Sequence, residues 1–400
     1  MLELIVKWLV GGVSFALILT LLVFVHEWGH YIVARLCGVS VQRFSIGFGK
    51  PIFKYKAKSG TEWVFARIPL GGYVKFLGDA GAASNPDVEE LERIKKNFDG
   101  KYGENAWKSC LHFKPLWQRA LVAAAGPIAN FVLAALLFAI LAFSFGTNSL
   151  VGVKVAKVVE GSAAAQAGFQ VGDEILSIDG KPVKKAQDVM RIVSLHSGDE
   201  LKIHIRREGR ELDLKATPRR TVVRDGIGGK AEMGRLGIAI GGDYVHTEYS
   251  LAGAGLYGIS QVKTVLSGTM HYIGRIFVGK ENGKAMGGIV RIAAQTGKIG
   301  ADAVSVDGGF KTKLRSWIVG FLWMSATLSV GLGFANLMPI PVLDGGHLLY
   351  YGYEAIMRRP LSMAAQEIGF RIGLAVLLTL LIVLTVNDTG YVSGLFSKNG

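Results

Sequence analysis

Apolar residues form four long runs in this chain, each about as long as the 20 or so helical residues that cross a bilayer. Shorter and mixed patterns fill the intervals between these runs. The pattern therefore predicts an α-helical polytopic membrane protein with about four spans. The runs lie within residues 1–35, 117–145, 317–345 and 367–388, and a tail follows at 389–400.

The interval at 36–116 has the pattern of β structure followed by a connector. Short aromatic and β-branched runs at 44–49 and 63–68 are punctuated by Gly and Pro, which is typical of hairpins. The apolar stretch at 68–74 indicates that the hairpin dips toward the bilayer. We therefore predict a membrane-reentrant β-hairpin region, and a mobile or short helical connector over the acidic, polar residues 79–105.

Residues 150–245 have the mixed composition of a soluble domain. A short helical segment at 161–168, a Gly-Asp turn at 172–173 and a strand that ends in Asp-Gly resemble a bacterial PDZ domain. Residues 201–206 alternate between apolar and polar, as a strand with one solvated face does. We predict an inserted α+β PDZ domain, a fold that binds peptide chain ends by adding a strand to its own sheet.

Residues 250–310 carry spaced apolar side chains among Gly, Lys and Gln. This pattern predicts one or two amphipathic helices that lie against the membrane or against the core of the protein. An additional span is the alternative, and Lys263, His271 and Arg275 weigh against it.

Composition narrows the class of protein. Half of the residues are hydrophobic and the mean hydropathy is positive, which favours an integral membrane protein with a soluble part. The net charge of +14 does not indicate a nucleic-acid partner, because no basic stripe is interleaved with aromatic residues. Lys and Arg beside membrane spans explain the charge instead. Cys37 and Cys110 are too few for a disulfide framework and are expected to be free thiols.

The first apolar run ends in the HExxH motif HEWGH at residues 26–30. On a helix, His26 and His30 leave the same face and can bind one zinc ion. Glu27 follows the first histidine, where a carboxylate can take a proton from metal-activated water. The alternative is a pair of interfacial histidines with a glutamate that snorkels. Three ionisable groups at the end of a span are costly, however, unless they have a function.

A catalytic zinc site needs a third protein ligand in addition to two histidines. A metzincin would supply it from the extension of the motif, but Val33 and Leu36 occupy the positions of its glycine and third histidine. A soluble gluzincin would supply a glutamate from a helix shortly downstream, yet no Asp or Glu occurs between His30 and Glu62. The third ligand is therefore expected from a distant part of the chain.

Topology offers Asp344 as that ligand. Spans one and three run in the same direction, so their C-terminal ends reach the same side of the membrane and bring Asp344 level with the histidines. A turn-forming Asp-Gly is the structural alternative for Asp344, and His347 is either a competing ligand or a supporting residue. Asn130, a polar residue in the second span, fits an interhelical hydrogen bond and a role in the site equally well.

HEWGH in the first span, Leu-Asp-Gly-Gly after the third and a PDZ module between the second and third resemble the site-2 protease family, with RseP-like bacterial intramembrane metalloproteases as the closest type. Residues 68–75 match that group's reentrant β-loop, 125–130 its second-span motif and 336–345 its second metal-binding signature. The likeness covers nearly the whole chain. RseP itself carries two PDZ modules and one is evident here, a difference that concerns substrate gating.

The resemblance implies a zinc metalloendopeptidase in which His26, His30 and Asp344 bind Zn²⁺. Glu27 would be the general base and later the acid, and Asn336 would hold the extended substrate backbone or stabilise the oxyanion. The substrates would be transmembrane segments of membrane proteins, such as anti-sigma factors or remnant signal peptides. A multi-pass protein of the bacterial inner membrane would follow, with the active site toward the cytoplasmic side and the PDZ domain outside.

Two other functions are compatible with parts of the sequence. A non-catalytic membrane-anchored PDZ scaffold would capture chain ends, bind no metal and be indifferent to substitution of Glu27. A metal transporter would use the same intramembrane His and Asp side chains. It would, however, show polar residues in several spans at matching depth, and spans two and four are nearly free of them.

Overall fold

The computed structural model describes residues 2–77, 92, 95–96, 106–224 and 230–396. Most of the connector expected at 79–105 lies outside the described residues. The chain divides into two compact units, which are residues 1–138 with 296–383 and residues 139–295 with 384–400.

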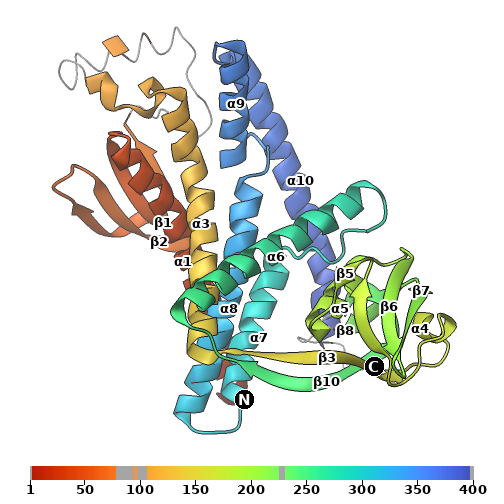
Figure 1. Ribbon diagram of the computed structural model, residues 1–400. Coiled ribbons are helices and arrows are strands. Elements are labelled where there is room, and N and C mark those ends of the chain that lie inside the picture. Colours follow the sequence, from red (N-terminus) through yellow and green to blue (C-terminus); the bar gives the residue numbers. More distant parts are fainter. Residues whose placement is uncertain (1, 78–91, 93–94, 97–105, 225–229, 397–400) are drawn as a thin grey trace. The chain divides into compact units, whose positions relative to one another are not determined.

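Within the described residues, four helices are long and apolar enough to cross a membrane. They overlap the four predicted apolar runs and are α1 (Leu2–Leu36), α3 (Leu116–Phe145), α8 (Phe310–Asn336) and α10 (Met363–Phe396). In Figure 1, α9 follows α8 after a short break in the helix. The remaining helices that belong wholly or partly to the first unit are α7 (Ile289–Ser305), α9 (Asp344–Met357) and the 3₁₀ turns Ala106–Ser109 and Leu111–Phe113.

Helices α1 and α8 run in the same direction. Near their beginnings, Trp317 Nε1 of α8 donates a hydrogen bond to Ser14 Oγ of α1 at 2.8 Å. Further along, Leu22 of α1 and Met324 of α8 belong to one buried cluster. Because residue numbers rise together along both helices, their C-terminal ends lie at the same end of the bundle.

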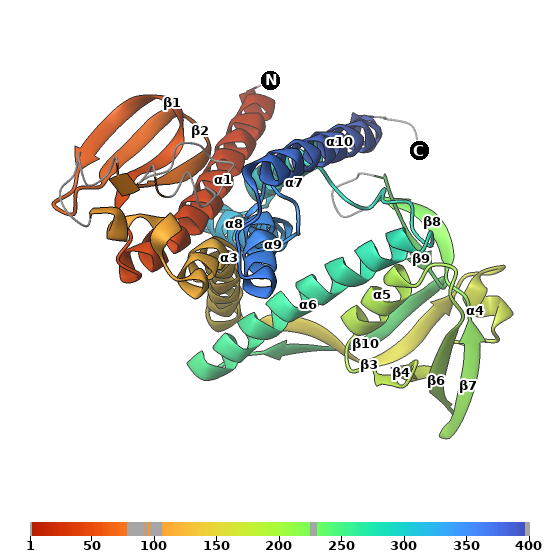
Figure 2. The same ribbon diagram turned by 90° about the horizontal axis from the view of Figure 1, so that it is seen from above.

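The first unit also contains an antiparallel sheet that packs against α1 (Figure 2). Phe44 is fully buried there, and its ring centroid lies 4.5 Å from that of Trp63 and 6.3 Å from that of Trp28 on α1. The β structure expected in this region is therefore present, whereas its entry into the membrane stays a prediction. Strands β1 (Val41–Lys56) and β2 (Glu62–Phe76) bend so that four segments lie side by side in the order 72–76, 41–46, 62–65 and 51–56.

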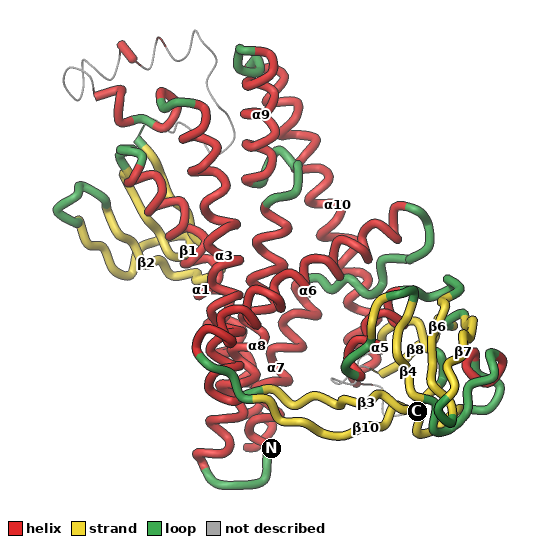
Figure 3. The backbone as a smooth tube through the Cα atoms, in the orientation of Figure 1, coloured by secondary structure: helices red, strands yellow, loops and turns green. Residues whose placement is uncertain are grey.

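The second unit is built around an antiparallel sheet with strand order β10-β3-β4-β6-β7, to which β5 adds beside β4. Figure 3 shows β3 and β10 as a long ribbon. The strands of the whole sheet are β3 (Thr147–Val158), β4 (Glu174–Ile178), β5 (Lys181–Pro182), β6 (Leu201–Arg207), β7 (Arg210–Ala216) and β10 (Ile238–Thr247). A separate pair, β8 (Arg219–Arg224) and β9 (Lys230–Arg235), and the helices α4 (Ala163–Gln166), α5 (Ala186–Leu195) and α6 (Leu251–Phe277) complete the described elements.

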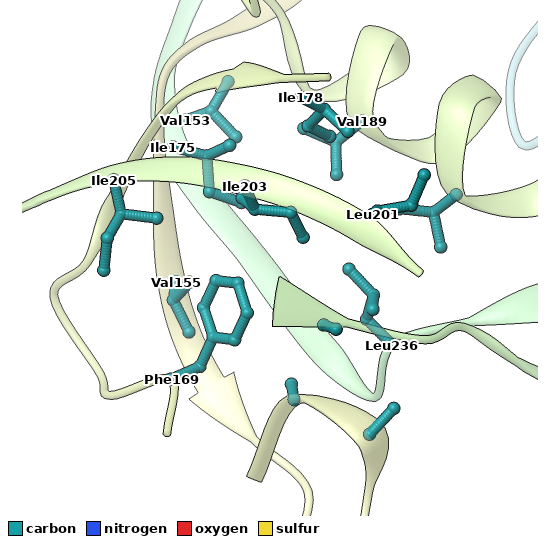
Figure 4. Packing of buried hydrophobic residues seen from close by; sticks show 14 residues of the cluster. Val153, Val155, Phe169, Ile175, Ile178, Val189, Leu201, Ile203, Ile205 and Leu236 are labelled. Atoms are coloured by element: carbon teal, nitrogen blue, oxygen red, sulfur yellow. The ribbon is translucent and has the colours of Figure 1, made fainter. Parts of the chain in front are cut away.

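This inserted α+β domain has a hydrophobic core of its own (Figure 4). Every second residue of β6, namely Leu201, Ile203 and Ile205, is buried, as the alternating sequence pattern predicts. Ile175 of β4 and Phe169 pack against them. The domain is therefore held by side chains of its own sheet and of the short helices that cover it.

Candidate metal centre

Helix α1 presents both histidines of the HExxH motif on one face. His26 and His30 are each 9% exposed, and their Nε2 atoms lie 3.2 Å apart. A helix places residues four apart one above the other, so the motif needs no distortion to bring the two nitrogens together.

Helix α3 packs antiparallel to α1 at this level and orients the histidines. His30 Nδ1 donates to the carbonyl oxygen of Val122 at 2.8 Å, while His26 faces Asn130, further along α3. Gly29 permits this approach, because a Cβ there would lie 2.7 Å from Ala129 Cβ. A proton on His30 Nδ1 leaves Nε2 with a free lone pair, which is the form that binds a metal.

Gly126 of α3 has no side chain and therefore leaves the space in front of the two imidazoles open. A Cβ at this position would lie 2.8 Å from both Nε2 and Cε1 of His26, and closer still to His30 Nε2. Any larger residue would therefore fill the volume toward which both Nε2 atoms point.

Asp344 completes the group from the first turn of α9. Its Oδ2 lies 3.1 Å from His26 Nε2 and 3.5 Å from His30 Nε2. The turn before α9 is tight, because a Cβ on Gly346 would lie 2.8 Å from the carbonyl carbon of Ile340. Two prolines and two glycines thus end α8 and begin α9 within a few residues, and they bring the carboxylate to the histidines.

These three side chains fit a zinc ion. Their candidate ligand atoms all lie within 4.8 Å of one another, and Asp344 Oδ2 is buried yet accepts no well-aligned hydrogen bond. Two imidazole nitrogens and a carboxylate oxygen are ligands that zinc prefers, and three protein ligands leave a fourth position open. A cation between them would satisfy the otherwise unpaired oxygen.

An ion pair between α3 and α9 supports the position of Asp344. The Arg119 guanidinium forms hydrogen bonds to both carboxylate oxygens of Glu354 and lies over the ring of Tyr351, 5.2 Å from its centroid. Both partners of the ion pair are largely buried, with side chains 12% and 19% exposed. This bidentate pair anchors the helix that carries Asp344 to the helix that orients the histidines.

Glu27 is half-buried and lies beside the last segment of β2. The backbone N–H of Val74 donates a hydrogen bond to its carboxylate. A Cβ on Gly72 would lie 3.4 Å from Glu27 Cγ, so the strand passes close to the glutamate. The carboxylate is therefore held next to an extended backbone segment as well as next to the two histidines.

The structure brings together His26, His30 and Asp344, which the sequence placed in one site. His347 is not in this group; it lies further along α9, with its ring 6.5 Å from that of Tyr350. Asn336 is the last residue of α8, and no described hydrogen bond joins its side chain to the three ligand candidates.

Sequence reasoning missed two parts of the site on α3. The Val122 carbonyl carries no signal in the sequence, because every residue has a carbonyl group. Gly126 does carry one, because it lies in the stretch 125–130 that resembles the second-span motif of the family, but the sequence assigned Gly126 no role in the site. Asn130 combines the two roles that the sequence left open, since its contact with His26 is both interhelical and part of the site.

Comparison with known proteins identifies the family of this chain. Residues 14–380 match the model of peptidase family M50. The metalloprotease MmpA of Caulobacter vibrioides is 40% identical, over 98% of this chain and all of that protein. A protein of Agrobacterium fabrum named "putative zinc metalloprotease" is 42% identical, over 96% of each chain. Among solved structures, the PDZ domain of an SdrC-like protein from Listeria monocytogenes is similar to 22% of this chain, covering 86% of its own length, with 24% identity and a TM-score of 0.18.

Long apolar helices that carry a candidate metal site fit a membrane-bound metalloenzyme. The family match and the full-length relatives then make the assignment specific. The chain belongs to peptidase family M50, the site-2 protease family, and is a metalloprotease of the site-2 type.

Proposed function

We propose that this protein is an intramembrane zinc metalloprotease that hydrolyses peptide bonds within transmembrane segments of other membrane proteins. The observation that carries the proposal is the convergence of His26, His30 and Asp344 beside Glu27, on helices apolar enough to span a membrane. The names of the relatives support zinc as the metal.

In this proposal, His26, His30 and Asp344 hold the zinc ion. When bound, zinc would lower the pKa of a water molecule to about 7 and polarise the scissile carbonyl group. Glu27 accepts the proton of the attacking water and passes it to the leaving amine. The hydrogen bond from the Val74 N–H keeps the Glu27 carboxylate oriented for both transfers.

The last segment of β2 is proposed to receive the substrate. A transmembrane helix must unwind before attack, and in lipid its freed N–H and C=O groups need partners at once. Among the described strands, segment 72–76 pairs only with 41–46, so its other edge can accept an extended chain directly beside Glu27. Asn336 is proposed to hold the extended substrate backbone or to stabilise the oxyanion.

The inserted domain is proposed to act as a PDZ module that binds peptide chain ends and delays substrates with a bulky outer domain. Its supporting features are the antiparallel sheet with β10 at one edge and the neighbouring helix α5. Strand addition at such an edge is how PDZ domains bind. We further propose the bacterial inner membrane as the location, with the active site toward the cytoplasm, and anti-sigma factors or remnant signal peptides as substrate classes.

The test is the Glu27→Gln variant, purified in full length and co-expressed with a transmembrane reporter. Gln keeps the size of the side chain but cannot accept a proton, so cleavage should fall by a factor of about 10² to 10⁴. Zinc content, measured by elemental analysis, should remain that of the unmodified protein. Cleavage at the normal rate would contradict the proposed mechanism, and a purified protein without metal would favour the non-catalytic PDZ scaffold.

A further inference from the structure

The two histidines of the metal centre are oriented by different kinds of groups. The Val122 carbonyl opposite His30 Nδ1 can only accept a hydrogen bond, so the position of the proton on His30 is determined. His26 Nδ1 instead lies 3.2 Å from the side-chain amide of Asn130. An amide accepts through its oxygen and donates through its nitrogen. Which ring nitrogen of His26 carries the proton therefore depends on which end of the amide faces Nδ1.

Metal binding requires one of these two orientations. His26 Nε2 lies 3.1 Å from Asp344 Oδ2, so Nε2 is the nitrogen that faces the candidate metal position. To bind a metal, Nε2 must carry a lone pair, and the proton must reside on Nδ1. A protonated Nδ1 needs an acceptor opposite it, whereas the Asn130 NH₂ group would place two donors face to face.

A second observation selects the same orientation. Asn130 is fully buried, and with its Nδ2 toward His26 its Oδ1 has no hydrogen-bond partner. A buried acceptor without a donor costs about 1–3 kcal/mol. A half-turn of the amide exchanges two atoms of nearly the same size. It gives Oδ1 the Nδ1–H of His26 as its donor, so the buried oxygen gains the partner that it lacks and the His26 proton gains an acceptor.

We propose that Asn130 is a positioning residue that holds His26 in its metal-binding tautomer, by accepting the Nδ1–H of the imidazole through its side-chain oxygen. This inference rests on the proposed zinc site. The backbone of Asn130 is anchored separately, because its carbonyl oxygen accepts a hydrogen bond from Ser329 Oγ of α8 at 2.7 Å. Ser329 is fully buried as well. The side-chain contact can therefore be altered while the contact between α3 and α8 is kept.

The experiment compares three variants of the purified full-length protein. Asn130→Leu keeps the approximate size and removes the acceptor, and zinc affinity, measured by competition with a chelator, should fall about 10–100-fold. Asn130→Asp keeps an oxygen and has no donor, so its zinc affinity should stay close to that of the unmodified protein. Ser329→Ala removes a buried hydrogen bond at the same level without touching His26, and it should also bind zinc normally.

A spectroscopic readout separates ligand geometry from folding. Cobalt(II) in place of zinc should give the same visible absorption in the unmodified protein, Asn130→Asp and Ser329→Ala, and a changed spectrum in Asn130→Leu. Unchanged zinc affinity in Asn130→Leu would overturn the inference, as would an equal loss in Asn130→Asp and Asn130→Leu. An unmodified protein that binds no zinc would instead refute the proposed function, so the two failures are distinguishable.

Discussion

Two aspartates of this chain, Asp173 in one unit and Asp344 in the other, meet very different surroundings. Asp173 of the inserted domain is fully buried, and its carboxylate accepts hydrogen bonds from Arg207 Nε at 2.7 Å and from the Gln170 N–H at 2.8 Å. Asp344 has a side chain that is 20% exposed, yet its buried Oδ2 faces two imidazole nitrogens and accepts no well-aligned hydrogen bond.

The difference separates a structural carboxylate from one that is proposed to bind a metal. Asp173 forms an ion pair with Arg207, so its charge is neutralised within the protein. The pair also connects two parts of the domain. Asp344 has no guanidinium or ammonium partner in the described structure, and its nearest neighbours are histidines that act as ligands when they are neutral. A buried anion in such surroundings indicates a place for a cation from outside the chain.

The largest effect is expected from removing the carboxylate that lacks a partner. Asp344→Ala takes one of three ligands from the proposed zinc site, so zinc affinity should fall by more than the roughly 100-fold that loss of a supporting residue costs. Thermal unfolding in detergent should change little by comparison, because no guanidinium or ammonium group loses its partner. Zinc content after gel filtration checks this, and unchanged content would remove Asp344 from the ligand set.

The next largest effect should come from filling the space in front of the imidazoles. Gly126→Ala places a methyl group against both histidines, and displacement by about an ångström can lower the rate of catalysis on the order of 10²-fold. Gly331→Ala on α8 is the matched control, because its Cβ would meet no atom within 4 Å. Reporter cleavage and zinc affinity should both fall in Gly126→Ala alone; equal behaviour of the two variants would contradict the proposed geometry.

A smaller effect, on the stability of the inserted domain and not on zinc binding, is expected for Asp173, the carboxylate that has a partner. Asp173→Asn leaves Arg207 without its counter-charge. Breaking a buried ion pair costs about 3–5 kcal/mol. We expect a loss of stability at the lower end of this range, about 3 kcal/mol, because Arg207 is partly exposed. Hydrogen exchange of the β6 amides in the full-length protein should speed up accordingly. Zinc content should not change. A loss of zinc in this variant would show that the two aspartates do not act independently.

The smallest effect concerns pH. Burial alone would raise the pKa of Asp173, but the hydrogen bonds from Arg207 and from the Gln170 backbone outweigh it and hold this pKa below the ordinary value. A lowered pKa in the folded state stabilises the domain above the unfolded pKa of about 4, and this contribution is lost as the pH falls below it.

Unfolding of the inserted domain by urea, compared at pH 7 and pH 3, should therefore show an acid-induced loss of stability on the order of 1 kcal/mol that depends on Asp173. The Asp173→Asn variant should lack this part of the pH dependence. An identical pH dependence in both proteins would show that other carboxylates cause the loss.

Local patterns carried much of the fold and of the candidate site. Apolar runs predict the candidate membrane-spanning helices, because a helix in lipid must satisfy its own backbone hydrogen bonds and present apolar side chains to the lipid. Alternation predicts strand β6, and spacing along one helix predicts that His26 and His30 converge. Asp344 could also be found, because the direction of successive spans is a property of chain order.

Other features were decided only when separate segments packed together. The carbonyl of Val122 is a partner of His30 because α3 packs against α1 at that level, and no residue type in the sequence indicates this contact. The room left by Gly126 and the strand segment beside Glu27 likewise depend on contacts between distant residues. By itself the sequence determined which groups are able to bind a metal and move a proton. Tertiary structure decided how those groups are oriented, because contacts with neighbouring elements give His30 its hydrogen-bond partner and leave the space beside Gly126 open.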